Sequence, residues 1–150
     1  MLVNRSHCLK PARRSGACRK TSRAVRTMAT IQRFDCGARL SEMVIHNGTV
    51  YLAGQVPEDV SVDAKEQTAS VLKQIDELLA RAGTDKTRII SAQVFLRDLA
   101  DFPQMNEAWD AWVASGHAPT RATVEAKLAD PGWKVEIVVT AALEGTTVLK

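Results

Sequence analysis

The amino-acid sequence predicts an α+β fold in which two helices pack on one face of a mixed β-sheet. Three observations lead to this prediction. Asn47-Gly48, the strongest kind of short hairpin signal, lies between two apolar segments. Two later segments repeat apolar residues at helical spacing, and segments rich in β-branched residues lie between and after them. Because strands and helices are mixed along the chain, and two helices suffice to cover one face of one sheet, an α+β sandwich is expected.

The first half of the domain is predicted to form a hairpin followed by a long helix. Strands are expected over residues 42–46 and 49–54, and Pro57 ends the second because proline cannot donate to the ladder. A short edge strand near residues 31–34 is a further option. A helix is predicted over residues 61–82, with an apolar face formed by Ala69, Leu72, Ile75 and Leu79.

Local signals mark both ends of this helix. Asp63 is the predicted N-cap, with Glu66 three residues later as its capping-box partner. Gly83 is expected to stop the helix, because glycine readily takes the left-handed conformation that ends many helices.

One more helix and three more strands complete the predicted domain. In chain order they are a strand, the helix and two strands, over residues 88–96, 102–114, 120–126 and 133–143. Pro103 suits the first turn of the helix, and Gly116 is expected to end it. A turn over Asp130-Pro131-Gly132 separates the last two strands.

Charge divides the chain of 150 residues into two parts. Residues 1–28 hold eight of the 20 basic residues and none of the 17 acidic residues, so residues 29–150 are acidic overall. We expect residues 1–28 to be a disordered basic extension and residues 29–150 to form a single domain. Three explanations of the extension stay open: an organellar transit peptide, a non-native start ahead of Met28, or a nucleic-acid-binding arm.

The composition disfavours several classes of protein. The longest apolar runs are far too short to cross a bilayer, and the N-terminus has no apolar segment of signal-peptide length. An acidic domain behind a basic tail does not indicate nucleic-acid binding. Cys36 is the one cysteine of the domain, so a reducing compartment is expected. The expected location is the cytoplasm, or a mitochondrion or other organelle if residues 1–27 are a genuine transit peptide.

Arg121 and Glu136 are the residues whose chemistry most favours an enzyme. Arg121 lies between a proline-containing turn and a predicted strand, and its guanidinium can bind a carboxylate through two parallel hydrogen bonds. Glu136 lies within a β-branched strand, where a carboxylate can move protons or orient a water molecule. If the two side chains meet in one pocket, the substrate is a small molecule that carries a carboxylate. The structural alternatives are a surface or interface salt bridge of Arg121, for example with Glu125, and a solvated, outward-facing Glu136 on an edge strand.

Other chemistry has less support in the sequence. His46 and His117 have no second ligand at metal-binding spacing, so no metal site is expected. No glycine-rich motif for a dinucleotide or phosphate is present. Cys36 has no evident basic partner that would make it a nucleophile. Trp109 and Trp112 fit a core or an interface better than a platform for stacking.

An ordered set of short motifs resembles the Rid/YjgF family of reactive-intermediate deaminases over residues 34–144. Each motif alone is weak, but the set with its spacings is specific. The motifs are Asn47-Gly48, Val50-Tyr51-Leu52-Ala53-Gly54-Gln55, Ala82-Gly83, Val94-Phe95-Leu96-Arg97-Asp98, Phe102 with Asn106, Ala118-Pro119-Thr120-Arg121-Ala122-Thr123-Val124 and Val135-Glu136-Ile137.

The resemblance implies a chorismate-mutase-like fold, a homotrimer with pockets between subunits, and hydrolysis of 2-imino acids or their enamine tautomers to 2-oxo acids and ammonia. It implies no metal and no organic cofactor. Arg121 matches the carboxylate-binding arginine of the family, and Glu136 matches the glutamate that positions or activates water. Asn106 and Gly54 match positions of the pocket region. Backbone amides near Gly54 or Thr123 are candidates for holding the water or the substrate.

Three departures indicate a divergent subgroup. The archetypal deaminases have a tyrosine where this chain has residues 39–43, a serine where it has Ala53, and a cysteine where it has Thr123. These differences bear on the identity of the substrate rather than on the presence of a pocket. A second hypothesis is therefore kept: a non-catalytic trimer that binds a small molecule or a partner on the same fold.

Overall fold

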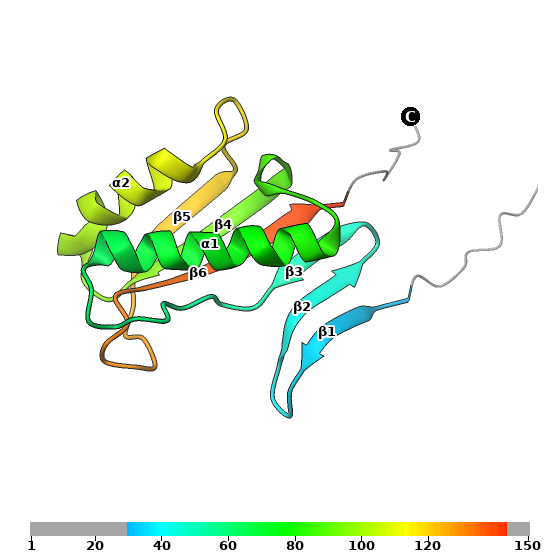
Figure 1. The fold of residues 1–150 in the computed structure, drawn as a ribbon, viewed down its shortest axis with the longest axis horizontal. Coiled ribbons are helices and arrows are strands. Elements are labelled where there is room, and N and C mark those ends of the chain that lie inside the picture. Colours follow the sequence, from blue (N-terminus) through cyan, green and yellow to red (C-terminus); the bar gives the residue numbers. More distant parts are fainter. Residues whose placement is uncertain (1–29, 144–150) are drawn as a thin grey trace, which may run out of the picture.

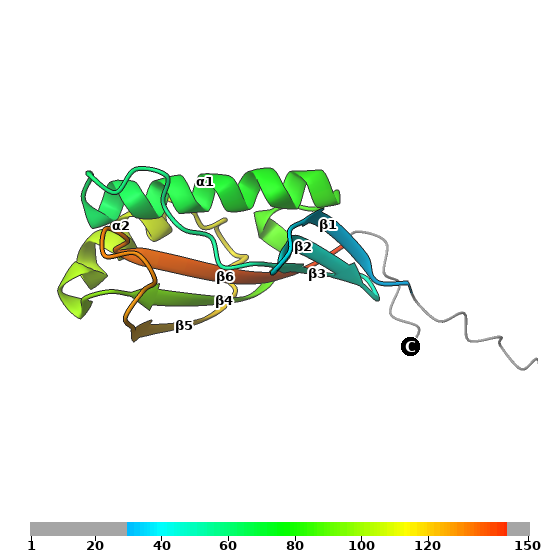
Figure 2. The same ribbon diagram turned by 90° about the horizontal axis from the view of Figure 1, so that it is seen from below.

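The computed structural model describes residues 30–143 as two layers, a mixed six-stranded sheet with two helices on one face (Figures 1 and 2). The predicted extension over residues 1–28 lies outside the described residues. The strand order is β1-β2-β3-β6-β4-β5, and only the β4–β5 pair is parallel among these strands. The main elements are β1 (Gln32–Cys36), β2 (Ser41–His46), β3 (Thr49–Leu52), α1 (Ala64–Ala82), β4 (Ile89–Leu96), α2 (Phe102–Trp112), β5 (Thr120–Glu125) and β6 (Val135–Ala142), with short 3₁₀ turns η1 (Lys86–Arg88) and η2 (Leu99–Asp101).

The predicted hairpin is confirmed, although its second strand ends at Leu52 and not at residue 54, and the optional edge strand is confirmed too. Strands β2 and β3 pair antiparallel through Asn47 and Gly48, whose φ angles of 51° and 73° are those of a tight hairpin turn. Strand β1 pairs with β2 at one edge of the sheet and spans Gln32–Cys36, one to two residues later than predicted.

Helix α1 has the predicted caps but begins three residues later than predicted. The carboxylate of Asp63 accepts a hydrogen bond of 2.9 Å from the backbone N–H of Glu66, and Gly83 takes a left-handed conformation with φ of 79°. Ser61 is excluded from the helix because its N–H and hydroxyl both donate to the carboxylate of Asp59, at 2.8 and 2.6 Å. This local turn competes with the first helical turn.

Helix α2 begins as predicted, with Pro103 in its first turn, but the predicted end is wrong. The helix stops at Trp112 because Val113 adopts an extended backbone, with ψ of 134°. Gly116, with φ of 76°, forms a later turn in the loop that leads to β5.

The core lies between the two helices and the sheet. Alternate residues of β6 point into it, namely Val135, Ile137, Val139 and Ala141. The intervening residues of β6, including Glu136, therefore lie on the other face of the sheet. No described element covers that face (Figure 2), and Tyr51 and Val124, which lie on it, are 47% and 48% exposed. No helix within residues 30–143 is long and apolar enough to cross a membrane.

Candidate functional site

Arg121 lies on β5, an edge strand, and its guanidinium stacks on a tryptophan of α2. Arg121 is the register partner of Ala92, a core residue of β4, so its side chain leaves the sheet on the helix side. Its Cζ atom is 4.9 Å from the centroid of the Trp109 ring. Within residues 30–143 the guanidinium makes no hydrogen bond and no ion pair, and its N–H groups are therefore available to a ligand.

The suggested ion pair of Arg121 with Glu125 is wrong. The carboxylate of Glu125 instead accepts a hydrogen bond of 3.1 Å from the backbone N–H of Leu99, in the turn that precedes α2. Strand β5 therefore runs antiparallel to α2. Arg121 contacts Trp109 near the end of α2, whereas Glu125, later in β5, contacts Leu99 before α2 begins.

Thr123 and Asn106 fall between these two contacts and carry unpaired oxygen atoms. Thr123 shares its face of β5 with Arg121 and Glu125, since alternate residues of a strand point the same way. Asn106 is one helical turn before Trp109 on α2. The Oδ1 atom of Asn106 and the Oγ1 atom of Thr123 are buried without a hydrogen-bond partner among the described residues. A buried polar atom without a partner costs about 1–3 kcal/mol, so each of these oxygens favours a partner that one chain does not supply.

Glu136 lies on the opposite face of the sheet, packed against Gly54. Its register partner is Phe95 on β4, which alternates with the core residues Val94 and Leu96. The carboxylate of Glu136 occupies the space next to Gly54, because a Cβ atom added there would overlap its Oε1 and lie 2.9 Å from its Cδ. Any residue other than glycine at position 54 would therefore require the Glu136 carboxylate to move.

The structure therefore divides the predicted site residues into two groups. Arg121, Asn106 and Thr123 lie at the β5 edge on the helix side, whereas Gly54 and Glu136 lie together on the uncovered side. A shared pocket of Arg121 and Glu136 within one chain is ruled out, because the sheet separates the two side chains. Any pocket that holds both must take them from two copies of the chain.

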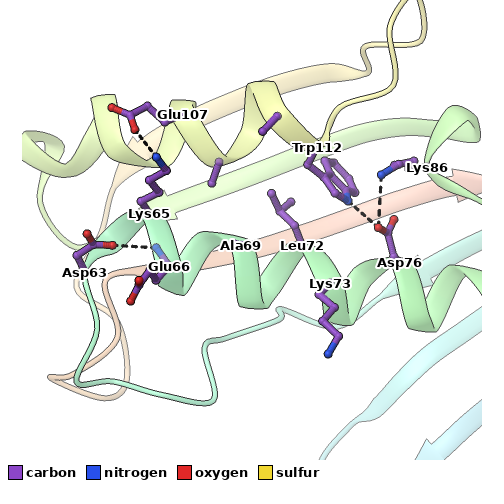
Figure 3. A pocket seen from close by; sticks show the side chains of 12 residues that line it. Asp63, Lys65, Glu66, Ala69, Leu72, Lys73, Asp76, Lys86, Glu107 and Trp112 are labelled. Atoms are coloured by element: carbon purple, nitrogen blue, oxygen red, sulfur yellow. Dashed lines mark hydrogen bonds and ion pairs between the residues drawn. The ribbon is translucent and has the colours of Figure 1, made fainter.

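Two grooves open elsewhere on the single chain, and one of them reaches Gly54. A groove of about 670 Å³ separates α1 from α2 (Figure 3), and Lys65 pairs with Glu107 at one end of it at 2.8 Å. The hydrogen bond to Glu107 raises the pKa of Lys65. A second groove, of about 420 Å³, is lined by Gly54 and four carboxylates. Neither groove is lined by Arg121 or Glu136. Within the described residues, no group of three or more potential metal ligands comes together.

Trp109 is the residue that the sequence analysis did not assign to the site. It was expected in the core or at an interface, and it is indeed buried, at 5% exposure. Its contact with Arg121 could not be read from the sequence, because it depends on which strand lies beneath α2.

The comparisons with known proteins agree with the fold and with the motifs. Residues 30–143 match the model of a family described as endoribonuclease L-PSP. A RutC family protein from Haemophilus ducreyi is 56% identical over 113 residues, which cover 75% of this chain and 97% of that protein. The human 2-iminobutanoate/2-iminopropanoate deaminase is 31% identical over 107 residues, covering 67% of this chain and 77% of that enzyme.

Solved structures share the same architecture. A YjgF-family protein from Neisseria meningitidis superposes with a TM-score of 0.76 at 49% identity, and the match covers 78% of this chain and 98% of that chain. The family match spans the whole described domain, and the RutC relative is similar over nearly its full length. The chain therefore belongs to the Rid/YjgF family.

Proposed function

We propose that this protein hydrolyses 2-imino acids or their enamine tautomers to 2-oxo acids and ammonia, in a homotrimer. The main support for the proposal is that the Arg121 guanidinium has no anionic partner among the described residues. It is held against Trp109 instead. That state suits the capture of a substrate carboxylate. The similarity to the human 2-iminobutanoate/2-iminopropanoate deaminase supports the reaction class.

The proposed site lies between two copies of the chain. Arg121 and Glu136 leave the sheet on opposite faces, so one copy supplies the arginine and its neighbour supplies the glutamate. Strand β5 is at the edge of the sheet, and one side of its backbone has no neighbouring strand within the described domain. The uncovered face carries the exposed side chains of Tyr51 and Val124. A closed three-fold ring would bury this face and place the β5 edge of each copy against the next copy.

The chemistry requires little beyond positioning. Arg121 fixes the substrate carboxylate, which sets the direction of the adjacent imine carbon. A water molecule held by Glu136 adds to that carbon, and Glu136 accepts a proton from the water. The proton passes to the nitrogen and gives a carbinolamine. Glu136 then transfers the hydroxyl proton of this carbinolamine to the same nitrogen, the C–N bond breaks, and ammonia leaves as the C=O bond of the 2-oxo acid forms. One water molecule is consumed for each ammonia released, and no metal or redox group takes part.

The test is an assay that generates 2-imino acids in situ with an amino-acid oxidase and follows their decay. We expect the wild type to accelerate the decay. Arg121→Lys should reduce kcat/KM by about 10–150-fold, because lysine keeps the charge but loses a charge-assisted contact worth about 1.5–3 kcal/mol. Arg33→Lys is the matched control, since Arg33 is an exposed arginine of β1, at the opposite edge of the sheet from Arg121.

The outcomes separate the two hypotheses. Equal acceleration by wild type and Arg121→Lys, in folded protein of unchanged mass, would show that Arg121 is not the anchor. No acceleration with any 2-imino acid, combined with Arg121-dependent binding of a 2-oxo acid such as pyruvate, would favour the non-catalytic binding trimer.

A further inference from the structure

We propose that Trp109 is a positioning residue, which holds the guanidinium of Arg121 in the orientation that binds the substrate carboxylate. This inference rests on the proposed function. It assigns a role in that site to a residue that makes no contact with the substrate itself.

The orientation of the Arg121 guanidinium depends on its contact with the Trp109 ring. An exposed arginine has a flexible side chain, and a carboxylate gains affinity when the fork is already oriented. Arg121 has no hydrogen bond that could orient it within the described residues. Its one close partner there is the Trp109 ring, 4.9 Å from Cζ to the ring centroid. A guanidinium at this distance is held by attraction to the ring, while its N–H groups stay free for hydrogen bonds.

The Trp109 ring is itself held by its neighbours. Trp109 is only 5% exposed, and the neighbouring ring of Trp112 packs against it with a centroid distance of 5.4 Å. The Nε1–H of Trp112 donates to Asp76 on α1 at 2.9 Å (Figure 3). Trp109 is therefore fixed between the core and a ring that is itself tied to α1.

The other cation–π contact among the described residues, between Lys86 and Trp112, includes a carboxylate. Lys86 lies 5.3 Å from the Trp112 ring centroid, and Asp76 pairs with it at 3.5 Å (Figure 3). The lysine charge is thus already neutralised by a carboxylate, whereas Arg121 has an aromatic face and, within residues 30–143, no carboxylate partner. An acidic residue would orient Arg121 but compete with the substrate. An aromatic ring orients it without such competition.

The experiment measures pyruvate binding and steady-state kinetics in variants of position 109. Trp109→Leu should raise the Kd of pyruvate and the KM of the imine substrate by about 2–30-fold, the range that corresponds to a cation–π contact of about 0.5–2 kcal/mol. The value of kcat should change less, because the ring does not touch the reacting atoms. Trp109→Phe should lie between the wild type and Trp109→Leu, since phenylalanine keeps a weaker aromatic face.

Fluorinated tryptophan at position 109 keeps the shape of the ring and separates electrostatics from packing. We expect the Kd of pyruvate to rise stepwise with each added fluorine, because fluorine weakens the negative face of the ring. The same series at position 112 is the control and should show no such trend, since that ring faces Lys86 instead.

Each outcome supports or overturns the inference. Binding that depends on Arg121 but shows no trend with fluorination at position 109 would overturn the role of Trp109 and leave the proposed function intact. Pyruvate binding that is absent in the wild type, or unchanged in Arg121→Lys, would overturn the proposed function and this inference with it.

Discussion

Mixing two variants of reduced activity should restore activity if each site takes Arg121 from one copy and Glu136 from the next. Arg121→Lys keeps an intact Glu136, and Glu136→Gln keeps an intact Arg121. The structure leads to this expectation because the two residues leave the sheet on opposite faces, Arg121 beside the core residue Ala92 and Glu136 beside Phe95. In a cyclic trimer every interface joins two different surfaces, so a hybrid can combine the two intact residues in one site.

The expected recovery follows from random assembly. In an equal mixture, a site is intact only when the copy that supplies the arginine is the Glu136→Gln chain and the copy that supplies the glutamate is the Arg121→Lys chain. These two choices are independent, so about a quarter of the sites of cyclic trimers are restored. The two variants should be co-expressed with different affinity tags, purified through both tags and assayed for decay of 2-imino acids. Purification through both tags removes the pure trimers, which hold no restored site, and raises the restored fraction to about a third.

A second mixture provides the control. Wild type co-expressed with the double variant Arg121→Lys/Glu136→Gln should retain about a quarter of the wild-type activity, before tag selection, if sites lie between copies. It should retain about half if each site lies within one chain. No recovery in the first mixture together with half activity in the second would refute the two-copy site.

Four further predictions follow from the same geometry. Gly54→Ala should lower kcat by about 100-fold with little change in Tm, because the added methyl group displaces the Glu136 carboxylate. Gly37→Ala is the control and should leave kcat unchanged, because an added Cβ there lies an ordinary 3.6 Å from the carbonyl oxygen of Leu40. Glu136→Gln should lower kcat by about 10²–10⁴-fold if the carboxylate carries a proton, while pyruvate still binds; unchanged turnover would place Glu136 outside the chemistry. Light scattering at micromolar concentration should give the trimer mass, and a monomer mass would contradict the assembly. A chain that starts at Met28 should keep its Tm and activity, because the described core lies between Met43 and Ala141; a large fall in Tm would count against this.

Features that depend on a few adjacent residues could be predicted from the sequence. Asn47-Gly48 fixes the hairpin because both residues accept positive φ, and Asp63 and Gly83 define the ends of α1. The prediction that Gly116 ends α2 was wrong, because a local signal permits a helix end without requiring it. Glycine permits a helix end, but the end occurred earlier, where Val113 turned to an extended backbone.

The arrangement of the site could not be predicted, because it depends on sheet order and register. Arg121 and Glu136 each alternate with their neighbours, but alternation alone does not say which set faces the helices. Strand pairing shows which face each side chain takes. Arg121 pairs with Ala92 and Glu136 pairs with Phe95. Ala92 and Phe95 both lie on β4, an odd number of positions apart, so they and their partners point to opposite faces. The stacking of Arg121 on Trp109 depends equally on β5 lying beneath α2.

The unpaired oxygens of Thr123 and Asn106 independently support a site that needs a second copy of the chain. The positions of Arg121 and Glu136 on opposite faces of the sheet support the same site. Both atoms are buried, and neither has a hydrogen-bond partner among the described residues. Both oxygens lie on the helix side of β5, beside an arginine that has no anionic partner among the described residues. This edge is therefore energetically incomplete in the described chain. Thr123 is also where the family's archetypal deaminases carry cysteine, and a hydroxyl is a stronger donor and acceptor than a thiol. The departure from the family pattern therefore adds hydrogen-bonding capacity at the edge where the neighbouring copy and the substrate are proposed to meet.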